Sequence, residues 1–91
     1  MRIHIISAII VVFVGFLTGL STIEWLFIIV AISLVIGTEM VNTAIESVVN
    51  LASPTFHPFA KQAKDVAAGA VLVFAISSVI IGLLIFIPKW L

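Results

Sequence analysis

Three long runs of apolar residues make up most of the chain, and only short polar segments separate them. A helix needs about 20 mainly apolar residues to cross a membrane. The runs therefore predict three membrane-spanning helices, over residues 3–20, 24–51 and 59–87. The first run is slightly short for this task, and the last two turns of the second should emerge at the membrane interface.

The links between the predicted helices restrict how they pack. The first link, residues 21–23, is so short that it forces an antiparallel hairpin, and it offers Ser21 or Thr22 as an N-cap. The second link, residues 52–58, contains two prolines, which interrupt helices. A further proline, Pro88, is expected to stop the third helix.

The composition supports a membrane protein and narrows its function. Of the 91 residues, 64% are hydrophobic and 9% are charged, and the mean hydropathy is +1.46. A soluble domain has about a quarter of its residues charged, so the sequence predicts one all-α integral membrane domain over residues 1–91. A formal net charge of zero gives no basic face for nucleic acid, and the lack of cysteine excludes thiolate catalysis.

The few positive charges predict an orientation. Arg2, Lys61 and Lys64 lie on one side of the predicted bundle, and Lys89 lies on the other. Cytoplasmic segments of membrane proteins carry an excess of lysine and arginine. We therefore expect a multi-pass protein of the cytoplasmic membrane, with the N-terminus and the second link in the cytoplasm.

Four polar residues form a stripe on the second predicted helix, which is otherwise apolar. Glu39, Asn42, Glu46 and Asn50 fall within roughly 80° of one another around the helix axis. Ionisable groups at membrane depth are expensive and mark functional sites. The alternative is a stripe of hydrogen bonds that only joins helices.

The depth of this stripe suggests where the chemistry takes place. Glu39 lies roughly 21 Å from Trp25 along the helix, and Glu46 lies about 10 Å further. Lys64 and Asp65 enter at the same level from the third helix. These groups should therefore meet near the inner boundary of the membrane, where a water-soluble molecule can react with a lipid.

Other polar residues permit a structural and a functional interpretation. Lys61 and Asp65 are four residues apart and can form a surface pair. Lys64 can contact phosphate, or it can simply anchor the helix at the interface. His57 can touch a nucleotide or be an ordinary loop residue, and His4 is interpreted as an interfacial residue.

Small residues indicate close helix packing. Gly15 and Gly19 form a GxxxG pattern in the first run, and Ala63, Ala67 and Ala70 form a stripe in the third. Small side chains let helices approach closely in lipid. Because three helices alone shield an acidic stripe poorly, we also expect a homo-oligomer.

Two segments carry a resemblance to a known family. Residues 39–50 read EMVNTAIESVVN and residues 63–71 read AKDVAAGAV. They resemble the prokaryotic diacylglycerol kinase family, whose pattern is roughly E-x-x-N-[ST]-A-I-E-x-V-V-D followed by A-K-D-x-[AG]-[AS]. The segments Arg2-Ile-His4 and Phe56-His57-Pro58 are most similar to its Gram-positive branch, whose members phosphorylate undecaprenol.

The resemblance covers essentially the whole chain and implies a fold and an activity. Members are small three-span proteins that assemble as homotrimers, with sites composed between subunits. They transfer the γ-phosphate of MgATP to a lipid hydroxyl. The resemblance thus implies ATP and a membrane lipid alcohol as substrates, and Mg²⁺ as the metal.

The resemblance also implies individual roles. Glu39 occupies the position that accepts the proton of the lipid hydroxyl, Asn42 lies beside it as a second catalytic residue, and Glu46 is a metal and ATP ligand. Gly69 falls where the lipid approaches, and Arg2 is assigned to the same lipid site.

The remaining implied roles concern ATP. Lys64 and Asp65 occupy nucleotide-binding positions at the start of the third helix. Thr55, Phe56 and His57 match the segment of the second link that touches ATP.

Two departures from the family pattern are visible. Members carry an amphipathic helix before the position of Arg2, with a second metal-binding glutamate, and this helix does not precede Met1 here. Asn50 stands where the family usually has aspartate. The chain is therefore either a piece of a longer reading frame or a weakened relative, and the sequence leaves both open.

Four functions compete on this evidence. An undecaprenol kinase is favoured by the Gram-positive-like segments, and a diacylglycerol kinase would use the same machinery on another lipid. A non-catalytic relative would keep the fold without the activity. An ion- or proton-translocating bundle would use Glu39 as its carrier, but it leaves Glu46, Lys64 and Asp65 unexplained.

Overall fold

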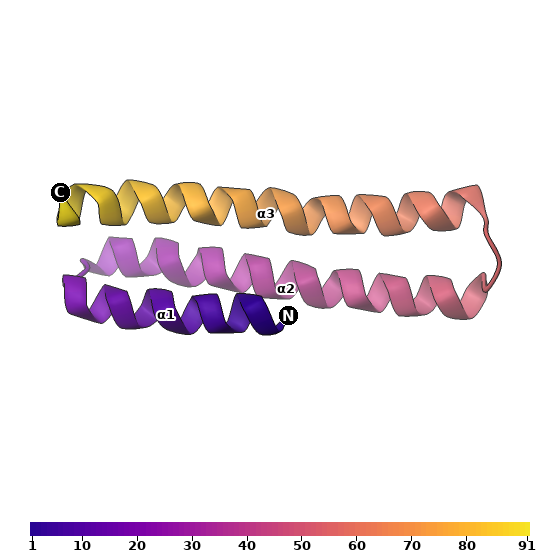
Figure 1. Cartoon of the computed structure of the whole chain (residues 1–91), viewed down its shortest axis with the longest axis horizontal. Coiled ribbons are helices and arrows are strands. Elements are labelled where there is room, and N and C mark those ends of the chain that lie inside the picture. The colour runs from indigo at the N-terminus through magenta and orange to yellow at the C-terminus, as the bar shows by residue number, and fades with distance from the viewer.

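The structure is a computed structural model that describes all 91 residues as three antiparallel helices. They are α1 (Arg2–Thr18), α2 (Thr22–Ala52) and α3 (Pro58–Trp90). Together they form a rod of 51 × 18 × 18 Å, in which α1 lies beside one half of α2 and α3 runs along its whole length (Figure 1). The expected all-α fold is confirmed, with the helix ends shifted by a few residues from the expected ones.

Two of the three helices meet the requirements of a membrane span. The 31 residues of α2 and the 33 residues of α3 are long and apolar enough to cross a membrane. The 17 residues of α1 are apolar but fall short of the about 20 residues that a span needs. The structure therefore supports a membrane protein with at least two candidate spans.

The turn between α1 and α2 is closed by specific local chemistry. Gly19 ends α1 with φ at +76°, a left-handed conformation that glycine adopts without strain. Ser21 then starts α2 with a capping box: its hydroxyl accepts from the Glu24 backbone N–H at 3.2 Å, and the Glu24 carboxylate accepts from the Ser21 N–H at 2.9 Å. Of the two expected N-caps, Ser21 is thus the one used.

The two glycines of the GxxxG pattern have different roles. A Cβ added at Gly15 would lie 2.7 Å from an atom of the Trp25 ring, so this glycine does permit close packing of α1 on α2. Nothing lies within 4 Å of a Cβ added at Gly19, which is the helix cap instead. Only Gly15 therefore confirms the packing expected from the pattern.

The end of α3 corrects one expectation. Pro88 does not stop the helix, which continues to Trp90. Proline lacks the N–H that would bond to the preceding turn, but its ring fixes φ near −65°, which is a helical value. The backbone can therefore continue as a helix after Pro88, and the last turn closes through the Leu91 N–H, which donates to the Ile87 carbonyl at 2.9 Å.

Packing of α2 against α3 forms the core. Ile28, Ala31 and Val35 of α2 are buried, as is Ala67 of α3. The Ser78 hydroxyl of α3 lies 3.3 Å from the Ala31 carbonyl, where it joins the two backbones. Most other apolar side chains remain exposed, which suits a protein surrounded by lipid or by further copies.

One end of the rod ties all three helices together. The Lys89 ammonium lies 3.0 Å from the Glu24 carboxylate, which joins α3 to α2. The Trp90 indole N–H donates to the Thr18 hydroxyl at 2.8 Å, which joins α3 to α1. We call this end, with the turn between α1 and α2, the pinned end.

Candidate functional site

Glu39 lies where α1 begins, near the middle of α2. Its carboxylate contacts the Met1 ammonium through one oxygen and the His4 ring Nδ1 through the other. Only 17% of its side chain is exposed. Its backbone carbonyl also accepts from the Thr43 hydroxyl at 3.1 Å. Glu39 is therefore a shielded carboxylate held by groups from another helix.

One turn further along α2, Asn42 and Glu46 form a pair. The Asn42 amide N–H donates to Glu46 Oε1 at 3.2 Å. The Asn42 Oδ1 atom is buried and has no hydrogen-bond partner, which is costly for a polar atom. The pair thus combines a buried amide oxygen that has no partner with an exposed carboxylate.

The start of α3 contributes two charged contacts. The Lys64 ammonium lies 2.5 Å from Asn50 Oδ1, which joins the polar stripe of α2 to α3. The expected pair of Lys61 and Asp65 is present at 2.5 Å, with both side chains 63% exposed. The neutral Asn50 side chain thus accepts a hydrogen bond from the charged Lys64 side chain.

The link between α2 and α3 is held by its own residues. The His57 ring accepts from the Phe59 N–H at 3.1 Å and so caps α3, and the two rings lie 5.7 Å apart. The Ser53 hydroxyl donates to the Thr55 carbonyl at 3.1 Å. The Phe56 side chain is exposed and can contact another molecule.

The two residues assigned to the lipid lie at the edges of this region. Arg2 is exposed at the start of α1. Gly69 has no atom within 4 Å of an added Cβ, so it faces open space in the single chain.

Within one chain the structure brings the expected site residues together only in pairs. Glu39 contacts the start of α1, Asn42 contacts Glu46, and the Asn50–Lys64 contact lies further on. These positions spread over about 16 Å of helix. No group of three or more histidine, aspartate and glutamate side chains lies close enough to hold a metal ion.

Sequence reasoning missed the contact between His4 and Glu39. The two residues are 35 positions apart, and His4 looked like an interfacial residue. A signal was nonetheless available, because an antiparallel hairpin brings together residues equally far from its turn. His4 and Glu39 lie at similar distances from the turn at residues 19–21, on opposite sides of it.

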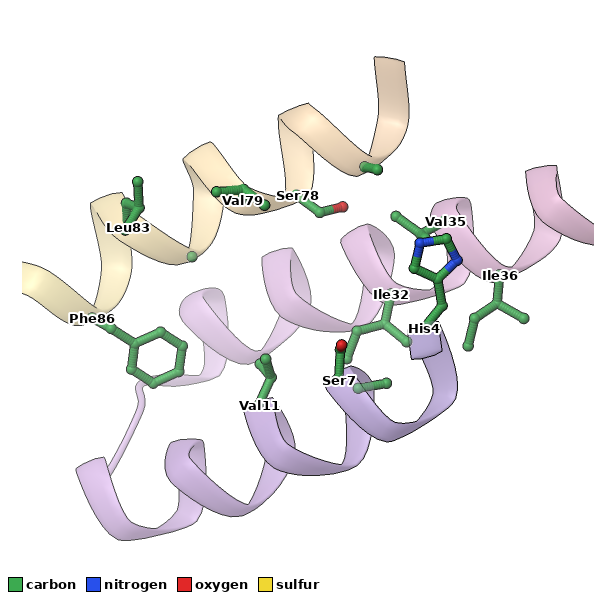
Figure 2. A pocket seen from close by; sticks show the side chains of 13 residues that line it. His4, Ser7, Val11, Ile32, Val35, Ile36, Ser78, Val79, Leu83 and Phe86 are labelled. Carbon is green, nitrogen blue, oxygen red and sulfur yellow. The ribbon is translucent and has the colours of Figure 1, made fainter. Parts of the chain in front are cut away.

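His4 also lines a cavity between the three helices. The cavity has a volume of about 420 Å³ and mostly apolar walls. Figure 2 shows His4 at one end of it, with Phe86 at the other end and Val11 between them on α1. The histidine that contacts the shielded carboxylate therefore lies beside an apolar space.

Comparisons with known proteins match nearly all of this chain. The profile of the family described as prokaryotic diacylglycerol kinase matches residues 1–86. The chain is 54% identical over 86 residues to a Bacillus subtilis protein named undecaprenol kinase. The matched residues are 94% of this chain and 70% of that protein. No solved structure matches it.

More distant relatives carry another name. The chain is 41% identical over 91 residues to a Synechocystis protein named diacylglycerol kinase, and it spans 52% of that protein's length. A Helicobacter pylori protein of the same name is 35% identical over 72 residues, which are 79% of this chain and 56% of that protein.

Proposed function

Because the chain belongs to the prokaryotic diacylglycerol kinase family, we propose that it is a lipid kinase that transfers the γ-phosphate of ATP to undecaprenol. The observation that carries this proposal is the position of Glu39. Its carboxylate is shielded among apolar helices, and more exposed polar groups follow it toward one end of the rod. This increase in exposure of the polar groups along the rod suits a reaction between a lipid hydroxyl in the membrane and a nucleotide in water.

The reaction needs one base and accurate positioning. The lipid oxygen forms a bond to the γ-phosphorus while the bond from that phosphorus to the leaving ADP oxygen breaks. The hydroxyl proton passes to Glu39, which acts as the general base. Asn42, one turn away, orients polar groups of the reactants.

The metal proposed for this site is Mg²⁺, which binds one or two carboxylates together with substrate phosphates. Glu46 is an exposed carboxylate and a hard oxygen donor, so it fits such an ion as the protein ligand on this turn of α2. Mg²⁺ would neutralise phosphate charge during transfer. The remaining ligands would come from ATP and water.

The rest of ATP is assigned to the region around the second link. Lys64 and Asp65 would bind phosphate and nucleotide, and Thr55, Phe56 and His57 would touch the nucleotide from the link. Lys64 is already directed toward the polar stripe by its contact with Asn50. This contact would hold the Lys64 ammonium where a phosphate can also reach it.

The lipid would approach from the membrane side. Gly69 presents open space on α3, and Arg2 presents a positive charge at the start of α1. We propose that the Arg2 charge helps to hold the lipid headgroup or its new phosphate near Glu39.

We propose three spans per chain, with the N-terminus in the cytoplasm of a bacterial cell. The 17 residues of α1 give a length of about 26 Å, which comes close to the about 30 Å of a bilayer core. Arg2, Lys61 and Lys64 would then lie on the cytoplasmic side.

A homotrimer is part of the proposal. Large apolar side chains of α3, among them Leu72, Val79 and Leu84, are exposed, and Glu46 is open to the outside of the chain. Neighbouring copies would cover these surfaces and could complete each site.

Transfer of labelled phosphate from ATP to undecaprenol by the purified chain, in detergent with Mg²⁺, tests this function. Transfer that disappears in Glu39→Gln supports it. Absence of transfer to any lipid alcohol, in a chain that remains helical, contradicts it.

A diacylglycerol acceptor is the second candidate, because two of the matched relatives carry that name. Both lipids should be offered to the same preparation at equal mole fraction. A higher kcat/KM for diacylglycerol would replace undecaprenol as the substrate.

A further inference from the structure

We infer that His4 is a positioning residue for the kinase reaction, which holds the Glu39 carboxylate in the orientation needed to accept the lipid proton. This inference rests on the proposed function. It starts from one contact, between the His4 ring Nδ1 on α1 and Glu39 Oε2 on α2.

His4 is the only side chain that donates a hydrogen bond to the Glu39 carboxylate. The other group on this carboxylate is the Met1 ammonium, and the Thr43 hydroxyl contacts only the Glu39 backbone. No side chain of α3 bonds to it. Removing the His4 ring would therefore leave the carboxylate without any side chain to orient it.

Both partners are partly shielded from water. The Glu39 side chain is 17% exposed and the His4 side chain 30%, whereas the Lys61–Asp65 pair is 63% exposed on both sides. Polar contacts in a shielded place are stronger than contacts on an open surface. The His4–Glu39 contact can therefore fix a side-chain geometry that a surface pair cannot.

A free glutamate has three rotatable side-chain bonds, so an unheld carboxylate samples many directions. A base must lie within hydrogen-bond reach of the proton that it takes, and a displacement of 1 Å can cost about 100-fold in rate. One His4 bond uses one of about four lone-pair positions of the carboxylate, which leaves others for the lipid hydroxyl.

The cavity shows where this contact lies. His4 forms one end of the apolar cavity of about 420 Å³, and Figure 2 shows its ring at the end away from Phe86. The His4 ring extends from α1 and contacts a carboxylate on α2, so it joins two of the helices that line the cavity.

The test compares two substitutions at position 4. His4→Leu keeps the apolar packing and removes the donor, while His4→Asn retains a donor at the place of Nδ1. We expect kcat to fall about 10- to 100-fold in His4→Leu with the KM for ATP unchanged, and to recover to within about 3-fold of the parent in His4→Asn. Ser77→Ala, which removes an exposed hydroxyl bonded only within α3, is the control and should keep full activity.

A double variant separates positioning from a general effect on the fold. The double variant uses Glu39→Asp, which shortens the side chain by one methylene but keeps a carboxylate that can act as a weaker base. If His4 acts through Glu39, adding His4→Leu to Glu39→Asp should cause less than the multiplied loss of transfer. Equal losses in His4→Leu and His4→Asn, or losses that multiply in the double variant, would overturn the inference. So would an unchanged kcat in His4→Leu.

A second measurement distinguishes failure of this inference from failure of the proposed function. In the chain with nitrogen-labelled histidine, Glu39→Gln should shift the ring resonances of His4 and leave those of His57 unchanged. If the parent chain transfers no phosphate but this shift is seen, the contact stands and the kinase function fails. If the parent is active and the shift is absent, the His4 inference fails alone.

Discussion

The two halves of α2 differ in how completely their polar groups are satisfied. The half beside α1, residues 22–39, we call the covered half, and the half that extends past α1, residues 40–52, the free half (Figure 1). In the covered half, the Glu24 carboxylate bonds both the Ser21 backbone and the Lys89 ammonium. In the free half, Asn42 Oδ1 has no partner and Glu46 is exposed.

Because of this difference, one half of α2 contributes mainly to the stability of the fold and the other half mainly to the proposed reaction. The covered half contains three buried residues, Ile28, Ala31 and Val35, and the free half contains none. Polar groups that are already paired contribute to the fold, whereas an exposed carboxylate such as that of Glu46 can bind a ligand. Substitutions in the two halves should therefore act on different measurements.

The largest effect should come from Glu39→Gln, at the boundary between the halves. The amide cannot accept the lipid proton, and loss of a general base costs about 100- to 10,000-fold. Phosphate transfer should be abolished while the oligomer, measured by size in detergent, stays intact. Dissociation of the oligomer in this variant would instead make Glu39 a structural residue.

Glu46→Gln should have the next largest effect and should act through the metal. Loss of the carboxylate weakens the hold on Mg²⁺, so we expect about 10-fold lower transfer at limiting Mg²⁺. Raising the Mg²⁺ concentration should restore much of the rate, and the unfolding midpoint should not change. A defect that Mg²⁺ does not relieve would contradict a metal role.

Gly15→Ala should show the opposite pattern, with lost stability and retained chemistry. The new Cβ would lie 2.7 Å from the Trp25 ring, and overpacking costs about 1–3 kcal/mol. The better helix propensity of alanine offsets up to about 1 kcal/mol of this. Unfolding should occur at lower denaturant, with normal activity per folded molecule.

Gly37→Ala is the matched control, because nothing lies within 4 Å of its added Cβ. It should leave stability unchanged or raise it slightly. If both alanine variants unfold alike, the close contact of Gly15 with Trp25 does not contribute to stability.

The smallest effect should come from Asn50→Ala, which removes the acceptor of Lys64. The contact is exposed, so its loss should cost about 0.2–1 kcal/mol, or an increase in the KM for ATP of about 1.4- to 5-fold. Asn50→Asp keeps an acceptor and should not raise this KM. Identical KM values in both variants would show that Asn50 does not direct Lys64.

Local chemistry explains what the sequence predicted correctly. The apolar runs indicated the three helices, the short first link indicated the hairpin, and the spacing of Lys61 and Asp65 indicated their pair. Each of these rests on residues close together in the chain, or on a periodicity that lipid and helix geometry impose.

The sequence failed where position in space decides the outcome. Pro88 was expected to stop α3, but its fixed φ is helical and α3 continues through it to Trp90. His4 was interpreted alone, and only the folded hairpin shows that it meets Glu39. The metal, the ATP contacts and the lipid contacts involve partners outside the single chain, so their assignments remain proposals.

The short turn at Gly19–Ser21 also restricts which insertions and deletions the protein can tolerate. One inserted residue that extends either helix at this turn would rotate that helix by about 100° and shift it by about 1.5 Å along its axis, which would carry His4 away from Glu39. Insertions and deletions should therefore be rejected here, although this turn lies at the pinned end, far from the reacting groups. The link at residues 53–57 joins α2 and α3 beyond the reach of α1, so length changes there would leave the His4–Glu39 alignment intact.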